Sequence, residues 1–265
     1  MKTTKIFTIA ALALMLSACS SNEIEQIDLQ PNNKTEGIPF TATISIGESA
    51  TTRALSESGS TLVPSWKEGD KVALIHNGVN DEMTVESVNN GLATITGTIT
   101  GDPANGDAVT IIYPSSAVDE TTMDIKDNLL AEQEGTLAAI AEKYDVRKGT
   151  GTFNVGATAT LYGNVSLANQ FAIVKFTLTD GTNAINAKEF FIMDGSGNNV
   201  NSVAPASPTN TLYVAMTPAT SSTFMFRVFT ENGKAYDYTK TSVTLTAGKY
   251  YQSQMQMEWD EGYVG

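Results

Sequence analysis

The residues best suited to catalysis and metal binding are scarce in this chain. Among its 265 residues there is one histidine, His76, and one cysteine, Cys19. A Ser/His/Asp nucleophile would have to be built on His76, which stands beside the turn dipeptide Asn77-Gly78 and fits a hairpin better. A zinc site would lack its usual imidazole and thiolate ligands. The sequence therefore predicts no enzyme, no metal site and no cofactor.

Two loops carry the carboxylate and amide oxygens that a hard cation such as calcium prefers, residues 101–107 and 194–199. Neither has the calcium-loop spacing with its closing glutamate. We interpret both as surface loops. An enzyme acting through oxygen-bound calcium is the least favoured of the functions considered.

Cys19 is the reactive residue with the clearest context. Lys2 and Lys5 precede an apolar run over residues 6–16. A basic start and an apolar run too short for a membrane span are typical of an export signal. Leu16-Ser17-Ala18-Cys19 resembles the bacterial lipobox, in which the cysteine is diacylated and becomes residue one. We predict a signal peptide over residues 1–18 and lipid on Cys19, the alternative being an ordinary cleaved signal.

Residues 19–37 form an acidic, polar tether with nothing to build a core. Loss of the signal removes two lysines and moves the net charge from -13 to -15, which disfavours nucleic acid as a partner. Acidic residues behind an acylated cysteine resemble the surface-export signal of Bacteroidetes-type lipoproteins, and the alternative is a solvated linker facing the periplasm. With one cysteine, stability must come from burial and not from disulfides.

A period of two in the hydrophobic pattern predicts a mostly β chain. The cleanest run begins at Pro39 and places Phe40, Ala42, Ile44 and Ile46 on one face. Further strands are predicted over residues 71–76, 82–88, 92–99, 109–113, 172–178, 189–193, 212–216 and 224–228. One short helix is predicted within residues 135–143.

The remaining patterns suggest how these strands are grouped. Alternation over Val243–Trp259 predicts one long last strand, and the polar residues 147–160 predict a loop that divides the chain. We expect two β-sandwich domains, residues 38–163 and 164–265. Four aromatic residues are assigned to cores in preference to a glycan-binding platform: Trp66, Tyr213, Phe224 and Phe226.

Arg53 lies in a polar segment directly after the first predicted strand. It is the only lysine or arginine between Lys34 and Lys67. Polar loops are where proteolytic nicking concentrates, so a trypsin-like protease could cut after it. The alternative is a plain surface arginine.

Several segments, in their order and spacing, resemble the fimbrillin family, the subunits of type V pili in gut and oral Gram-negative anaerobes. The resemblance covers nearly the whole mature chain. It is carried by the lipobox at Cys19, Thr52-Arg53-Ala54, Trp66–Val72, Gln133–Leu137, Tyr144-Asp145, Ala172–Phe176, Tyr213–Pro218 and Ala247–Tyr251. It implies an all-β fold of two tandem transthyretin-like β-sandwich domains.

The resemblance also implies a mechanism of assembly. An arginine-specific protease would cut the outer-membrane lipoprotein between Arg53 and Ala54 and release the first strand. A C-terminal strand of the next subunit would then fill the groove. The displaced residues would be Phe40, Ala42, Ile44 and Ile46. The donor would be residues 252–259, continuing to Gly265, with Tyr251, Met255, Met257 and Trp259 as its inserted side chains. The alternative is that this segment completes its own sheet.

The function expected from these observations is that of a fimbrial subunit that serves attachment at the cell surface. Its expected partners are other fimbrial subunits in a head-to-tail polymer, the outer membrane, the protease and a receptor on a host or bacterial surface. The alternative from a different class is a monomeric outer-membrane lipoprotein that stays anchored through Cys19 and binds glycans.

Overall fold

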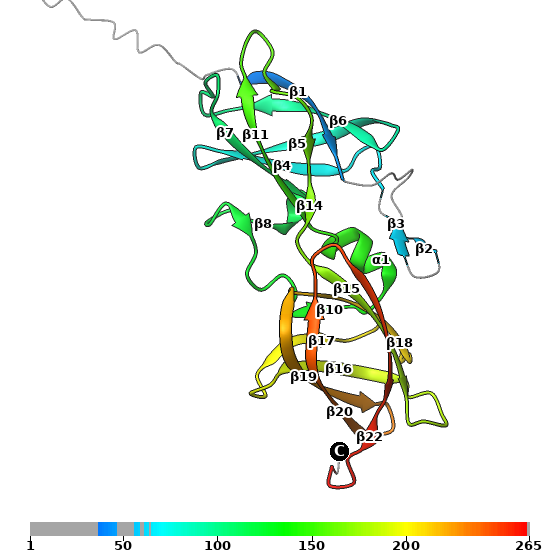
Figure 1. Ribbon diagram of the computed structural model, residues 1–265. Helices are drawn as coiled ribbons and strands as arrows, with labels where there is room; N and C mark the ends of the chain where they lie inside the picture. The colour runs from blue at the N-terminus through cyan, green and yellow to red at the C-terminus, as the bar shows by residue number, and fades with distance from the viewer. Residues whose placement is uncertain (1–36, 47–55, 59–60, 64, 264–265) are drawn as a thin grey trace, which may run out of the picture. The chain divides into compact units, whose positions relative to one another are not determined.

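The computed structural model describes residues 37–46, 56–58, 61–63 and 65–263. Within them the chain is mostly β-strand, as the alternating pattern predicts (Figure 1). The signal peptide, Cys19, Arg53 and Ala54 lie outside the described residues, as does the tether apart from Gly37. No helix among the described residues is long and apolar enough to cross a membrane.

The first sheet contains nine strands. They are β1 (Ile38–Ser45), β4 (Lys71–His76), β5 (Val79–Asn89), β6 (Leu92–Ile99), β7 (Ala108–Tyr113), β11 (Arg147–Asn154), β12 (Thr160–Leu161), β13 (Val165–Ser166) and β14 (Ala168–Asn169). Their order is β12-β11-β7-β4-β5-β6-β1-β13, with β14 paired to β11. Asn77-Gly78 and Asn90-Gly91 make the tight turns on either side of β5, with positive φ at all four residues.

This sheet closes on itself, because Ala159, which directly precedes β12, forms a parallel bridge with Phe40 of β1. The sequence predicts a sandwich of separate sheets here. The difference arises from β1, which joins β6 on one side to Ala159 and β13 on the other. A closed sheet encloses one core, in which Trp66 and Phe153 are almost fully buried.

Residues 147–160 are not the predicted dividing loop. Residues 147–152 pair with β7 in the sheet. The strand lacks an apolar pattern because Gly149 and Gly151 lie beneath the segment of β13. A Cβ at Gly149 would come within 2.7 Å of Leu167, and one at Gly151 within 2.8 Å of Val165. Glycine therefore serves close packing here.

A second group of strands forms two sheets around a second core. The strands are β10 (Glu132–Gln133), β15 (Ala172–Thr179), β16 (Ala187–Asp194), β17 (Asn199–Val203), β18 (Thr211–Met216), β19 (Ala219–Thr230), β20 (Ala235–Leu245), β21 (Tyr250–Gln256) and β22 (Glu258–Trp259). One sheet has the order β10-β17-β16-β19-β20-β22 and the other β18-β15-β21. Phe176, Phe190 and Phe226 pack together between them.

The predicted helix is present as α1 (Leu137–Ala139), which continues as a π-helical turn over Ile140–Tyr144. Thr136 begins it by accepting a hydrogen bond from the Ala139 amide at 3.1 Å. Ile140 and Tyr144 are buried, so the short helix is held by packing. The remaining short elements are β2 (Ser56–Ser58), β3 (Thr61–Val63), a 3₁₀ turn (Ser115–Ala117), β8 (Val118–Asp119) and β9 (Asp124–Ile125).

The single long last strand predicted over residues 243–259 is wrong. The chain turns after Leu245, with Gly248 at a φ of 75°, and returns as β21. Whereas β20 is antiparallel to β19, β21 runs parallel to β15 in the other sheet. The apolar residues stay at odd-numbered positions on both sides of the turn, because both strands face the same core. This regular spacing conceals the break.

The boundary between residues 163 and 164 stays a prediction. Val165 and Leu167 belong to the core of the closed sheet, and β14 still pairs with β11. The second core begins at Ala172.

Candidate functional site

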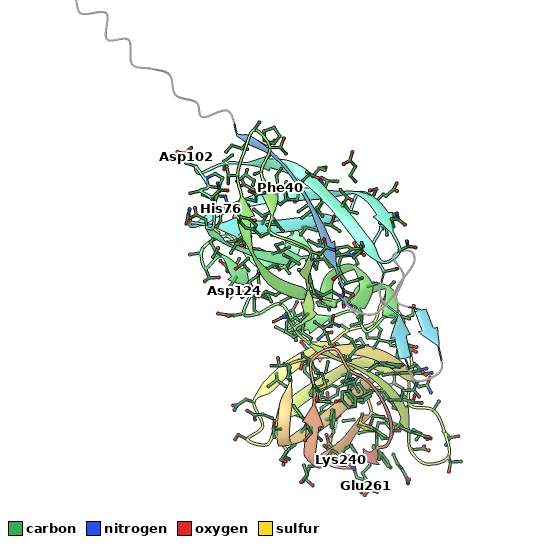
Figure 2. The ribbon with its side chains drawn as sticks, turned by 45° about the horizontal axis from the view of Figure 1, so that its top comes forward. Phe40, His76, Asp102, Asp124, Lys240 and Glu261 are labelled. Atoms are coloured by element: carbon green, nitrogen blue, oxygen red, sulfur yellow. The ribbon has the colours of Figure 1, made fainter. Side chains whose placement is uncertain are left out.

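Three of the four residues predicted to be displaced lie on the inner face of β1, and the fourth, Ile46, directly follows it. Phe40, Ala42, Ile44 and Ile46 are 2%, 9%, 0% and 4% exposed. The alternate residues Thr41, Thr43 and Ser45 are half-buried on the other face. The ring of Phe40 meets the edge of Phe153 with centroids 6.1 Å apart, and Figure 2 labels Phe40 on this strand. These four side chains are therefore part of the core of the closed sheet, and removal of the strand would leave a hydrophobic groove.

The backbone of β1 is paired along both sides. All eight residues of the strand are in register with β6, from Ile38 opposite Ile99 to Ser45 opposite Leu92. On the other side, Thr41 donates to the Ala159 carbonyl at 3.1 Å, and the Ala159 amide donates to Pro39 at 2.8 Å. The Leu167 amide donates to the Ser45 carbonyl at 2.8 Å. β1 is thus an internal strand of the closed sheet.

A buried ion pair marks the end of β1. Arg147 of β11 is 4% exposed, and its Nη2 lies 3.0 Å from Oδ1 of Asp145, which is 8% exposed. Its Nη1 donates to the main-chain carbonyl of Ile46 at 2.6 Å. Sequence reasoning missed this pair by placing Arg147 in a loop. The sequence holds one signal for it: the chain has only three arginines, and Arg147 lies two residues after the acidic Asp145.

The predicted donor residues lie in the second core. Met255 and Met257 are 1% and 3% exposed, while Trp259 is 55% exposed. Tyr251 is half-buried, and its hydroxyl accepts a hydrogen bond from the Thr246 amide at 3.0 Å. β21 lies at the edge of its three-stranded sheet, next to β15. In this structure the segment completes its own sheet.

His76 is the last residue of β4 and is 2% exposed. Its Nε2 lies 3.2 Å from Oδ2 of Asp81, whose Oδ1 accepts from the Thr100 hydroxyl at 2.8 Å. The ring packs against Phe153, with centroids 5.1 Å apart. This histidine is therefore part of the interior of the closed sheet, out of reach of a substrate.

The two oxygen-rich loops use their carboxylates internally. Asp194 accepts hydrogen bonds from the amides of Ser196 and Asn198 at 2.8 and 2.9 Å. The side-chain hydrogen bond from Asn198 lowers the pKa of Asp194. In the other loop Asp107 accepts from the Ala104 amide at 2.9 Å. Among the described residues no three His, Cys, Asp or Glu side chains gather as metal ligands would.

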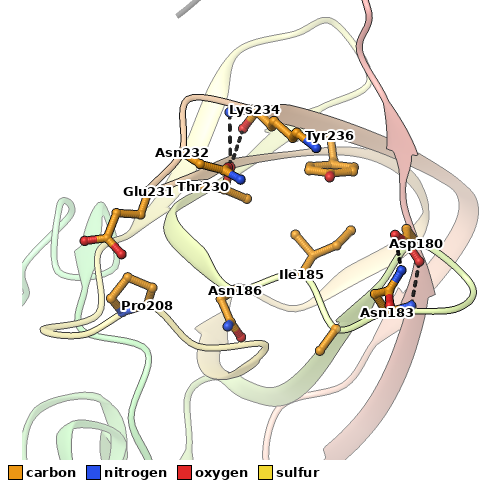
Figure 3. A pocket seen from close by; sticks show the side chains of 11 residues that line it. Asp180, Asn183, Ile185, Asn186, Pro208, Thr230, Glu231, Asn232, Lys234 and Tyr236 are labelled. Atoms are coloured by element: carbon orange, nitrogen blue, oxygen red, sulfur yellow. Dashed lines mark hydrogen bonds between the residues drawn. The ribbon is translucent and has the colours of Figure 1, made fainter.

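One open pocket of about 510 Å³ lies between the loop at residues 180–186 and the β19–β20 turn (Figure 3). Its apolar lining consists of Ala184, Ile185, Pro208 and the ring of Tyr236. Part of its polar lining is already hydrogen-bonded. Asp180 accepts from the Asn183 amide, and the Thr230 hydroxyl donates to the main-chain carbonyl of Lys234. The Nζ atom of Lys234 lies 5.3 Å from the ring centroid of Trp259. A glycan binder would have its candidate site here.

Comparisons with known proteins give likeness at the level of fold. No family model matches the chain, and no curated protein sequence matches it. The structure is similar to that of a candidate cell adhesion protein of Bacteroides ovatus, with a TM-score of 0.46 and 13% identity over 84% of this chain and 95% of that one.

Two further structures are similar in the same way. A candidate cell adhesion protein of Bacteroides uniformis gives a TM-score of 0.43 and 12% identity, covering 89% of this chain and 96% of the other. A fimbrial protein of Bacteroides ovatus gives a TM-score of 0.39 and 14% identity. That match covers 83% of this chain and 48% of the fimbrial protein.

Proposed function

We propose that this chain is a structural subunit of a cell-surface fimbrium of the type V class. It is exported as an outer-membrane lipoprotein on Cys19, cut between Arg53 and Ala54 by an arginine-specific protease, and polymerised by donor-strand exchange for adhesion. Its two core regions correspond in this proposal to two transthyretin-like domains divided near residue 163.

The observation that carries the proposal is the position of β1 inside the closed sheet. Phe40, Ile44 and Ile46 each contribute about 1.5–3 kcal/mol by burial. Their loss would cost on the order of 5–10 kcal/mol, which rivals the whole stability of a typical domain. It would also expose the backbone groups of β6 and of Ala159. A cut chain that loses β1 must therefore refill the groove.

The distribution of arginines supports a single cut. The chain has three, Arg53, Arg147 and Arg227. Arg147 is buried in β11, and Arg227 in β19 donates to Asp237 through Nε and Nη2, both at 2.7 Å. Proteases need an extended, accessible segment, which these paired strands do not offer. An arginine-specific enzyme acting on the folded protein is thus expected to cut at Arg53.

The C-terminal segment supports the donor role by its spacing. Met255, Met257 and Trp259 alternate as Ala42, Ile44 and Ile46 do, so one face of a strand could present them to the groove. Donation requires that Met255 and Met257 leave the second core, a cost offset by their burial in the next subunit. Joining each C-terminal segment to the following groove is head-to-tail and gives an open fibre.

Limited digestion of the purified protein with an arginine-specific protease tests the proposal. The expected product begins at Ala54, loses the segment that contains β1, and forms ladders that survive mild denaturation. Arg53→Lys is the matched control, because it keeps the positive charge and is not a substrate. That variant should stay uncut and monomeric.

A cut protein that releases the segment before Ala54 and stays monomeric would contradict polymerisation. A surface protein found solely with a blocked acyl-cysteine would contradict processing. The second result would favour the monomeric glycan-binding lipoprotein that stays anchored through Cys19, whose candidate site is the pocket beside Tyr236.

A further inference from the structure

The buried guanidinium of Arg147 is aimed at the strand that the proposed function removes. Ile46 follows the last residue of β1, and the register with β6 ends one residue earlier, at Ser45. Beyond that point the Ile46 carbonyl accepts from Nη1 of Arg147 at 2.6 Å. The Arg147 side chain of β11 thus hydrogen-bonds to the main chain at the point where the pairing between β1 and β6 ends.

Arg147 is held in this orientation by a carboxylate that does not belong to β1. Nε and Nη2 both donate to Asp145, at distances of 3.0–3.3 Å. The Asn169 side-chain amide lies 3.5 Å from the same carboxylate. Because Asp145, Arg147 and Asn169 all lie outside residues 38–46, the pair remains when β1 leaves. Nη1 would then be left facing the empty groove without this acceptor.

A buried charge that loses a hydrogen-bond partner is costly, so this position favours an occupant that restores the bond. Every residue has a main-chain carbonyl, so the hydrogen bond to the guanidinium does not depend on the sequence of the strand. It depends on whether the strand is long enough to place a carbonyl at this position. The apolar pockets respond to its alternating side chains. The two kinds of recognition are therefore separate.

We propose that Arg147, oriented by Asp145, is a binding site for a main-chain carbonyl. This carbonyl belongs to the residue that follows the last paired residue of whichever strand fills the groove. The occupant in the assembled fibre is the C-terminal strand of a second copy of this chain. The inference rests on the proposed function and adds a requirement to it. The donor must reach the position of Ile46, and a strand that ends one carbonyl short binds more weakly.

Peptide exchange into the nicked full-length protein tests this. One labelled peptide spans residues 38–46 and ends in a primary amide, so it keeps the Ile46 carbonyl. Its partner ends after Ser45 in a 2-methylbutylamide, which keeps the side chain of residue 46 and lacks the carbonyl. The difference between their dissociation constants isolates the carbonyl contact. We expect the second peptide to bind about tenfold more weakly.

The double variant Asp145→Asn/Arg147→Met removes both charges of the pair and avoids an unpaired buried carboxylate. In it the two peptides should bind within about twofold of one another. The control Arg227→Met/Asp237→Asn removes a half-exposed ion pair between β19 and β20, away from the groove, and should keep the tenfold difference. Arg147→Lys keeps the positive charge but places its donors on a single nitrogen, so it is a milder second variant with an intermediate difference expected.

Equal binding of the two peptides to the wild-type protein would overturn the inference and leave strand exchange standing. A tenfold difference that persists in the double variant would also overturn it. If the nicked wild-type protein neither releases its own segment nor admits either peptide, the proposed function fails, and this inference fails with it.

Discussion

The first and last long strands of the described chain occupy their sheets in different ways. β1 has neighbours on both sides and three buried side chains, and Ile46, which directly follows it, is buried as well. β21 lies at the edge of its sheet beside β15, and within its bounds Met255 is the one residue classed as buried. An internal strand cannot leave without opening its sheet, whereas an edge strand can. Under the proposed function, this asymmetry suits the place of β1 to the acceptor role and the segment of β21 to the donor role.

The largest expected effect is that of removing β1 altogether. A chain that starts at Ala54 should lose the cooperative unfolding of the first core, because about 5–10 kcal/mol of burial is missing. Near-ultraviolet circular dichroism during heating would measure this. Adding the peptide of residues 38–46 should restore the transition. An unchanged transition in the shortened chain would show that β1 is dispensable.

Single substitutions in β1 should separate its two faces. Ile44→Ala removes a fully buried side chain and should lower the free energy of unfolding by about 2–5 kcal/mol. Thr43→Ala, on the half-buried face, should cost under about 1 kcal/mol. Trp66 lies in the first core, so its fluorescence in a Trp259→Phe background would follow that core during denaturation. Equal losses for the two variants would mean that the faces do not differ as described.

Trp259→Ala should separate the monomer from the polymer. The side chain is 55% exposed, so the change should shift the free energy of unfolding by less than about 0.5 kcal/mol. Ladder formation after cleavage should nevertheless fall, because a donor residue is lost. Tyr162→Ala is the control, since Tyr162 is 58% exposed and directly follows β12 of the closed sheet. Polymer yields that fall equally in both variants would argue against a donor role.

The smallest effect concerns an ion pair on the exposed side of β11. The side-chain hydrogen bond from Lys148 lowers the pKa of Asp124 from its ordinary value of 3.8. The pair therefore stabilises the protein at neutral pH, and its contribution is lost as the pH falls through the lowered pKa. Asp124→Asn should cost about 0.2–1 kcal/mol at pH 7 and less near pH ~2.

Urea denaturation of both proteins across this pH range would measure that difference. Asp127→Asn, at an exposed position three residues further on, should change little at either pH. A cost of the Asp124 variant that is constant with pH would show that the charge is not responsible.

The sequence predicts the local features of this fold well. Alternation locates β1, and the two Asn-Gly dipeptides locate the turns that flank β5, because both features depend on neighbouring residues. Closure of the sheet depends on Ala159, which is far from β1 in the chain and has no periodic pattern around it. β11 is missed because close packing over Gly149 and Gly151 replaces the apolar residues that identify a strand.

The candidate site is predictable to the same extent. The buried residues of β1 and the buried Ile46 after it follow from their period of two. The contact between Arg147 and Ile46 joins residues a hundred positions apart, and a polar sequence conceals that Arg147 is interior. The turn at Gly248 was missed for the opposite reason, since two strands that face one core share one parity.

Closure of the first sheet also bears on when subunits join. Sheets with open borders are templates for unwanted pairing with other chains, and a closed sheet offers far less of such a border. In this proposal, the closed sheet of a newly made precursor would therefore offer few pairing sites to other copies while the chain crosses the cell envelope. Under the proposed mechanism, competence to assemble begins with the cut at Arg53, so fibre growth is confined to the place where the protease acts.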